Sequence, residues 1–211
     1  MISAVLWDFG GVITSSPFEA FNTLESSRGI PLGTIRKVNS TNPENNAWAR
    51  LERSEVSPAE FSELFHAESS ALGHPVAGSD VLAVLEGAIR PEMVTALQCV
   101  IKGGLKTACL TNNFNSGRND VVNDRATAVG TVMAMFDVVV ESRLIGVRKP
   151  EPAFYEYACN ALGVSPDQCV FLDDIGSNLK TAAAMGMTTI KVLGADQAIS
   201  DLESVLGISL R

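Results

Sequence analysis

The sequence predicts an α/β fold, namely a doubly wound (Rossmann-like) parallel sheet with a small all-helical cap inserted after the first strand. Three observations predict it. Short apolar runs end in polar residues, helical patterns alternate with these runs, and one connection is too long for a simple crossover. The 211 residues suffice for one such domain with a modest insertion.

The strands are predicted from short, continuous apolar runs. Such runs are typical of strands that are buried on both faces of a parallel sheet. Each run is followed by polar residues or by a glycine. The predicted strands are residues 4–7, 107–110, 138–140, 170–172 and 188–192.

Helical patterns lie between these runs, and each one ends at a glycine. A glycine just past a helix supplies the left-handed conformation that terminates it. The predicted helices are residues 91–102 before Gly103, residues 152–162 before Gly163 and residues 178–185 before Gly186. Alternating strands and helices imply a parallel sheet with right-handed crossovers.

About eighty residues separate the first strand from the helix that begins near Pro91, so this connection must hold structure of its own. Its apolar residues recur at helical spacing. The segment 57–60 reads Ser-Pro-Ala-Glu, a capping box with proline at the first helical position. We expect residues 16–88 to form the helical cap, and residues 1–15 and 89–211 to form the α/β catalytic core.

Charge and composition exclude several classes of partner. The formal net charge is −8, from 16 basic and 24 acidic residues without long runs, which argues against nucleic-acid and anionic-lipid surfaces. The N-terminus has neither the basic region of a signal peptide nor an apolar stretch of membrane-spanning length. We therefore expect a cytoplasmic protein, either a monomer or a homodimer, without nucleic-acid or membrane partners.

Polar side chains stand at the carboxyl ends of the predicted strands, where doubly wound sheets bind their ligands. Each residue alone fits a helix cap, a turn or a solvated loop. Their occurrence together at one edge indicates a site for a metal and a phosphate group. The residues are Asp8, Thr111, Asn112, Lys149, Asp173 and Asp174.

Phosphoryl transfer needs a nucleophile, a divalent cation and fixed donors that hold the phosphoryl group in line. Asp8 can attack and also offer its other oxygen to Mg²⁺. Asp173 and Asp174 add further hard oxygen ligands of the kind that Mg²⁺ prefers.

Three other residues fit the binding of a phosphate group. The hydroxyl of Thr111 and the amide of Asn112 are neutral donors suited to phosphate oxygens. Lys149 is a point charge that can offset the repulsion between the carboxylates and an incoming anion.

The order of these motifs resembles the haloacid dehalogenase superfamily, and the resemblance spans the whole chain. The last two motifs are especially similar to the N-terminal phosphatase domain of soluble epoxide hydrolase and to a related domain in some acyl-CoA dehydrogenases. The helical insertion matches the cap of the family. The motifs are Asp8-Phe9-Gly10-Gly11, Leu110-Thr111-Asn112, Lys149-Pro150-Glu151-Pro152 and Asp173-Asp174-Ile175-Gly176-Ser177-Asn178.

The resemblance implies a Mg²⁺-dependent phosphatase that acts on a small phosphorylated metabolite through an aspartyl phosphate. It makes Asp8 the nucleophile and a metal ligand, with Lys149 as a second catalytic residue. The main-chain carbonyl of Gly10 and the carboxylate of Asp174 would be further ligands. Asp173 would bind the metal directly or hold a coordinated water.

The chain departs from the family at Gly10, where family phosphatases usually carry a second Asp that acts as general acid and base. Such a group contributes about two to four orders of magnitude in rate. One interpretation is a phosphatase that is slow or that acts on good leaving groups, such as acyl or aryl phosphates.

A second interpretation is a dehalogenase or phosphonate-cleaving hydrolase, because these members also lack the second Asp. Dehalogenases generally need no metal, yet the acidic pair is retained here. Phosphonate cleavage uses a cap lysine, and Lys37 is the only lysine between residues 16 and 88. A third interpretation is a catalytically weak module that binds a phosphorylated ligand or a partner protein. In the cap, Trp48, Arg50 and Arg53 either face the substrate or belong to the core and the solvated surface.

Overall fold

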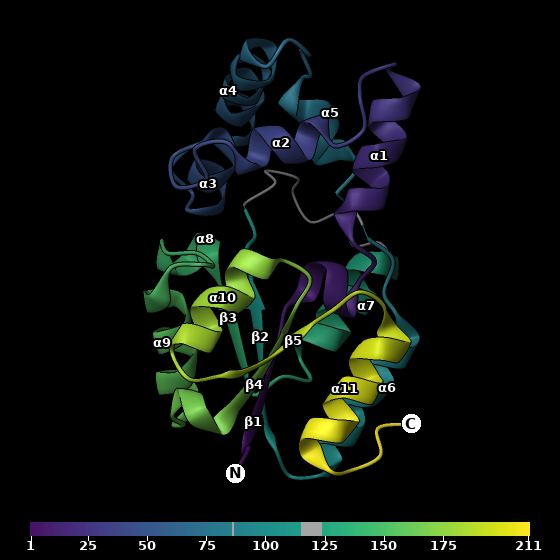
Figure 1. Cartoon of the computed structure of the whole chain (residues 1–211), viewed down its shortest axis with the longest axis vertical. Helices are drawn as coiled ribbons and strands as arrows, with labels where there is room; N and C mark the ends of the chain where they lie inside the picture. The colour runs from purple at the N-terminus through teal and green to yellow at the C-terminus, as the bar shows by residue number, and fades with distance from the viewer. Residues whose placement is uncertain (86, 115–123) are drawn as a thin grey trace.

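The structure is a computed structural model that describes residues 1–85, 87–114 and 124–211 (Figure 1). The first half of the chain forms β1 (Ala4–Trp7), the short helical turn η1 (Phe9–Ile13), α1 (Pro17–Ser27), α2 (Thr34–Ser40), α3 (Ala47–Glu52), α4 (Pro58–Ala71), α5 (Gly78–Ala83) and α6 (Pro91–Lys102). The second half forms β2 (Lys106–Thr111), α7 (Asp124–Met133), β3 (Val138–Glu141), α8 (Ser142–Ile145), α9 (Pro152–Leu162), η2 (Pro166–Gln168), β4 (Cys169–Asp173), α10 (Gly176–Ala184), β5 (Thr188–Lys191) and α11 (Ala195–Leu206).

The five strands form one parallel sheet in the order β3-β2-β1-β4-β5. Trp7, the last residue of β1, is opposite Cys109 of β2 and Leu172 of β4. The residues that follow these three strands therefore emerge at one edge of the sheet. The prediction of a doubly wound parallel α/β fold is confirmed.

Helices cover both faces of the sheet, which explains the continuous apolar runs. Val5 and Trp7 of β1 pack in one cluster with residues of α6 and α11, whereas Ala4 and Leu6 pack on the other face with residues of α9 and α10. Figure 1 shows these two helix pairs on opposite sides of the strands. Burial on both faces is the reason that the strands do not alternate apolar and polar residues.

Two predicted helices are confirmed at both ends, and a third is present with slightly shifted bounds. The helices at 91–102 and 152–162 have the expected bounds, and Gly163 adopts a left-handed φ of 64°. The helix predicted at residues 178–185 is α10, which begins two residues earlier, at Gly176. The N–H of Ile175, just before α10, donates to Oδ1 of Asp173 at 2.7 Å, so Asp173 ties the end of β4 to the residue before this helix.

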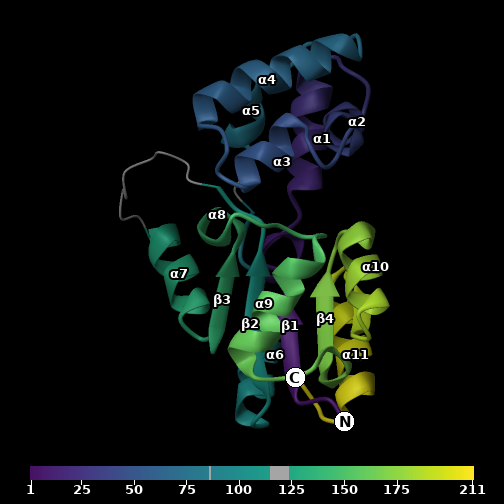
Figure 2. The ribbon, with the colours of Figure 1, turned by 90° about the vertical axis from the view of Figure 1, so that its left-hand side faces the viewer.

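The helices α1 to α5 form a separate layer around their own apolar cluster, which includes Phe21, Ile35, Phe61 and Phe65. Figure 2 shows this layer beyond the edge toward which the strands point. The predicted capping box is confirmed, because the Glu60 N–H donates to Ser57 Oγ and the Ser57 N–H donates to Glu60 Oε2.

We propose that this layer is the cap, with the domain boundaries given above. The chain leaves and rejoins the sheet domain side by side, since Thr14 and Ile89 form an antiparallel bridge. Across residues 1–85, 87–114 and 124–211, none of the helices combines the length and hydropathy that a bilayer crossing requires.

Candidate active site

Three carboxylates meet where the central strands end. Asp8 follows β1, Asp173 ends β4 and Asp174 follows it, and each offers an oxygen that lies within 4.8 Å of the other two. Asp8 and Asp173 are buried and Asp174 is half-buried. Carboxylates packed this closely repel one another unless cations neutralise them.

Lys149 supplies one such cation. Its Nζ lies 2.8 Å from Oδ1 of Asp8 and 2.8 Å from Oδ2 of Asp173, and the side chain is only 1% exposed. Burial alone would lower the pKa of Lys149, but the two carboxylates outweigh it and raise that pKa above its ordinary value. Burial raises the pKa of Asp8 well above its ordinary value, although Lys149 acts in the opposite direction.

Asp173 is held by protein donors on both oxygens. Its Oδ2 accepts from Lys149 Nζ and from Asn178 Nδ2 at 3.0 Å, and its Oδ1 accepts the Ile175 N–H. Asn178 lies in α10, and its carbonyl accepts the hydroxyl of buried Tyr155 at 2.9 Å. Asp173 therefore holds both the lysine and the residue before α10.

Asp174 is held less completely. Its Oδ2 accepts from Ser16 Oγ at 3.0 Å, and its main-chain carbonyl accepts from Lys191 Nζ. Burial, followed by the charge of Asp173, raises the pKa of Asp174. Within the described part of the chain, Oδ1 of Asp174 and Oδ2 of Asp8 accept no hydrogen bond, so each can take a ligand.

Gly10 and Gly11 form the turn after Asp8, and their surroundings differ. Gly11 has a φ of +81°, and a Cβ there would lie 2.2 Å from Asp174 Oδ2. Gly10 is exposed with a φ of −71°, and a Cβ there would meet nothing within 4 Å. The motif predicted a glycine-containing turn after Asp8, and Gly11 is the residue of that turn that needs a left-handed φ.

Thr111 is the last residue of β2 and is buried at the edge that carries the carboxylates. Asn112 follows it. Its Oδ1 accepts the Lys149 N–H at 2.9 Å, and its Nδ2 donates to the Lys149 carbonyl at 3.0 Å and to Glu52 Oε2 at 3.2 Å. The structure thus gives the Asn112 amide partners within the protein, whereas its binding to phosphate stays a prediction.

Glu52 and Arg148 are contacts that the sequence analysis missed. Glu52 ends α3 and is buried, and its Oε2 lies 2.5 Å from Nε of Arg148. This ion pair joins the helical layer to the residue before Lys149. No local pattern signals it, because its partners are 96 residues apart in the chain.

The three cap residues considered above have structural partners. Trp48 packs edge-on against Phe61 with ring centroids 5.5 Å apart, and its Nε1 donates to Glu52 Oε1 at 2.9 Å. Arg50 pairs with Glu55 at 3.9 Å, and Arg53 pairs with Glu151 at 2.9 Å. These contacts favour a structural role for the three residues over one in which they face the substrate. Lys37, the only cap lysine, is exposed on α2.

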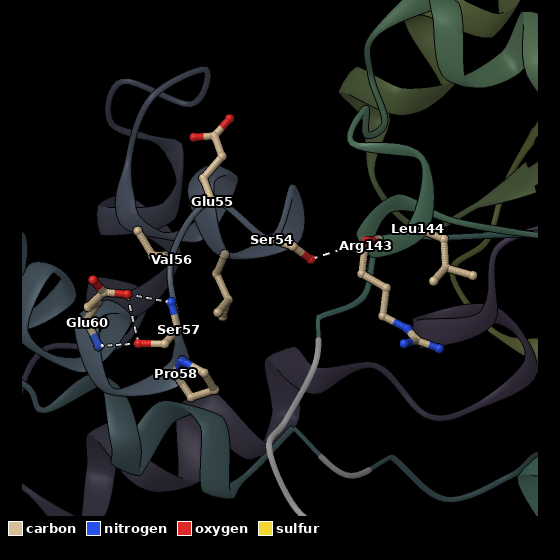
Figure 3. Close-up of a pocket in the computed structure, with 9 residues that line it drawn as sticks. Ser54, Glu55, Val56, Ser57, Pro58, Glu60, Arg143 and Leu144 are labelled. Atoms are coloured by element: carbon tan, nitrogen blue, oxygen red, sulfur yellow. Dashed lines mark hydrogen bonds between the residues drawn. The ribbon is translucent and has the colours of Figure 1, made fainter.

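A hollow of about 600 Å³ lies beside the helical layer, between residues 51–60 and α8. Figure 3 shows Ser54 between Glu60 on one side and Leu144 on the other; its hydroxyl donates to the Arg143 carbonyl at 3.3 Å. None of its lining residues belongs to the acidic cluster, so this hollow is separate from the candidate active site.

Comparison with known proteins identifies relatives along most of the chain. The sequence model of haloacid dehalogenase-like hydrolases matches residues 2–186. The chain is 36% identical to Acyl-CoA dehydrogenase family member 10 of Mus musculus over 98% of its length, but spans only 19% of that protein. It is 28% identical to Bifunctional epoxide hydrolase 2 of Sus scrofa over 99% of its length and spans 40% of that protein.

Other relatives are matched along nearly their whole length. The chain is 30% identical to Phosphatase MT3486 of Mycobacterium tuberculosis (strain CDC 1551 / Oshkosh), over 97% of this chain and 95% of that protein. A haloacid dehalogenase family enzyme of Bacteroides thetaiotaomicron, solved with magnesium and inorganic phosphate, has the same fold. Its TM-score is 0.62 at 19% identity, over 96% of this chain and 99% of that one. The chain belongs to the haloacid dehalogenase-like hydrolases.

Proposed function

We propose that this hydrolase is a Mg²⁺-dependent phosphatase that acts on a small phosphorylated metabolite through an aspartyl phosphate on Asp8. The observation that carries the proposal is the pairing of Asp8 with Lys149 inside a cluster of three carboxylates at the carboxyl edge of the sheet. The relative named as a phosphatase, which is matched along nearly its whole length, supports the same reaction class.

The donor set suits a hard divalent cation. The open oxygens belong to Asp8 and Asp174, and we add the main-chain carbonyl of Gly10 as a third ligand. Bound Mg²⁺ would neutralise charge on the phosphoryl oxygens. Asp173 has both oxygens engaged by protein donors, so we assign it to holding Lys149 and to acting on the metal through water.

In the proposed reaction, a carboxylate oxygen of Asp8 forms a bond to phosphorus while the bond from phosphorus to the leaving-group oxygen breaks. Water then attacks the phosphorus of the aspartyl phosphate, which frees phosphate and restores the carboxylate. Lys149 orients Asp8 and favours its ionised form, which opposes the rise in pKa that burial causes. Thr111, and the charge of Lys149, would hold the phosphoryl oxygens.

Gly10 defines which phosphates should react well. Without a carboxyl group at this position, no side chain on residue 10 can protonate the leaving group. We therefore propose acyl and aryl phosphates, whose leaving groups need little protonation, as better substrates than alkyl phosphates.

A screen of acyl, aryl and alkyl phosphates and of haloacids, with and without Mg²⁺, tests this function. Phosphate release that requires Mg²⁺ and is fastest for acyl and aryl phosphates is the expected result. Halide release without metal would identify a dehalogenase instead. Binding of inorganic phosphate without turnover of any compound would indicate the non-catalytic module.

A further inference from the structure

We propose that Glu52 of the helical layer is a positioning residue for Lys149, acting through the side chain of Asn112. This inference rests on the proposed function, because Lys149 serves the reaction of Asp8 there. The structure places three groups in series: the Glu52 carboxylate, the Asn112 amide and the main chain of Lys149.

The amide of Asn112 is bound to both main-chain polar groups of Lys149. Its Oδ1 accepts the Lys149 N–H and its Nδ2 donates to the Lys149 carbonyl. Two hydrogen bonds to one residue fix the orientation of its main chain, and hence the point from which its side chain leaves. The ammonium group at the far end then meets Asp8 and Asp173 at 2.8 Å each.

Glu52 favours the orientation of the Asn112 amide that the main chain of Lys149 requires. An ionised carboxylate only accepts hydrogen bonds, so it attracts the Nδ2 end of the amide and repels the Oδ1 end. With Nδ2 toward Glu52, Oδ1 faces the Lys149 N–H, which needs an acceptor. A flipped amide would lose all three contacts, the one to Glu52 and the two to the main chain of Lys149.

Glu52 is itself held rigidly. Its Oε1 accepts from Trp48, which packs in the helical layer, and its Oε2 accepts from Arg148. The carboxylate is almost completely buried, with 8% of the side chain exposed. The contact of Glu52 with Asn112 therefore depends on how the helical layer docks on the sheet domain. Through Asn112, this docking affects the position of Lys149 beside Asp8.

The chain offers a matched control. Arg53, just after α3, pairs with Glu151 of the sheet domain at 2.9 Å. Within the described part of the chain, the hydrogen bonds and ion pairs of Glu151 do not reach Asn112 or the Lys149 side chain. Glu151→Ala breaks a contact of the same kind between the two parts. It leaves the series from Glu52 to Lys149 intact.

The test is a double-mutant cycle on p-nitrophenyl phosphate with Mg²⁺. We expect Glu52→Ala and Asn112→Ala each to lower kcat at least about tenfold with KM changed less than about threefold, and the double variant to be little worse than Asn112→Ala. Glu52→Gln should recover most of kcat, because its amide oxygen can still accept from Asn112. Glu151→Ala should cost less than about threefold and combine with Asn112→Ala multiplicatively.

A second readout needs no catalysis. The ammonium group of Lys149, held by two buried carboxylates, should give a slowly exchanging ¹H–¹⁵N NMR signal in the wild type. We expect this signal to be lost in Glu52→Ala and kept in Glu151→Ala. If wild type releases no phosphate while the signal still depends on Glu52, the proposed function fails and the positioning role stands.

Two results would overturn the proposal. One is equal loss of kcat in Glu52→Ala and Glu151→Ala, which would mean that Glu52 only docks the helical layer. The other is a double variant in which the losses of kcat from Glu52→Ala and Asn112→Ala multiply, together with a Lys149 NMR signal that is unchanged in Glu52→Ala.

Discussion

Gly11 lies so close to Asp174 that a Cβ atom on the glycine would stand 2.2 Å from Oδ2 of the carboxylate. The left-handed φ of +81° adds a second barrier to any other residue. The turn after Asp8 therefore packs directly against the carboxylate of Asp174. This contact gives a first prediction.

Gly11→Ala should lower the free energy of unfolding by at least about 2 kcal/mol, because it adds a steric clash to an unfavourable φ. Gly10→Ala is the matched control, since its φ is −71° and its Cβ has open space. It should change that free energy by no more than about 1 kcal/mol, in the stabilising direction. Urea denaturation measures both, and equal effects would contradict the packing described here.

Lys149→Met should destabilise the metal-free protein by roughly 3–5 kcal/mol, since it leaves the buried carboxylates of Asp8 and Asp173 without their shared cation. It should also abolish most phosphate release. Lys37→Met, on the exposed face of α2, should change stability by less than about 0.5 kcal/mol. Chemical denaturation in a chelator tests this prediction, and an unchanged midpoint for Lys149→Met would refute the role of the pair.

Gly10→Asp should raise the turnover of alkyl phosphates by about tenfold or more, because the carboxyl group can protonate the leaving oxygen. The space around a Cβ at this position makes the substitution sterically feasible. Gly10→Asn has the same shape without the acid and should give no gain. If the folded Asp variant gains nothing over the Asn variant, the pocket was not built for alkyl phosphates.

The raised pKa of Asp174 predicts that the stability of the metal-free protein depends on pH. Its pKa in the folded protein is raised above the ordinary 3.8, mainly by burial. As pH rises, Asp174 therefore loses its proton in the unfolded chain before it does so in the folded protein. The free energy of unfolding falls until the pH has passed the pKa of the folded state. Asp174→Asn should be more stable than wild type at neutral pH in a chelator, and this advantage should shrink near about pH 4.

Denaturation at both pH values measures this difference. Asp80→Asn, which alters a half-buried carboxylate in α5, should not show the same pH dependence. Added Mg²⁺ should raise the Tm of wild type much more than that of Asp174→Asn. Equal responses of the two proteins would argue against Asp174 as a ligand.

The fold and most of the cluster could be predicted because their signals are local. Asp8, Thr111 and Asp173 each end a buried apolar run, and parallel strands bring their carboxyl ends to one edge. The start of α10 could not be placed, because Gly176 and Ser177 are poor helix formers. A hydrogen bond from Ile175 to Asp173 ties the residue before this helix to the end of β4.

The contacts between the helical layer and the sheet domain could not be predicted. Glu52 ends α3, a helix of six residues, and its sequence neighbourhood does not distinguish it from a solvated residue. Its partners Asn112 and Arg148 come from distant segments, and their meeting depends on how the two parts dock. The two bonds from Asn112 to Lys149 have the same non-local origin.

The central claim is that Asp8 forms the bond to phosphorus, and the rate of Mg²⁺-dependent phosphate release by Asp8→Asn tests it most directly. With an acyl or aryl phosphate that wild type hydrolyses, we expect Asp8→Asn to be at least about a thousandfold slower. Asp80→Asn, the same substitution outside the cluster, should keep the wild-type rate. Undiminished phosphate release by folded Asp8→Asn would contradict the account.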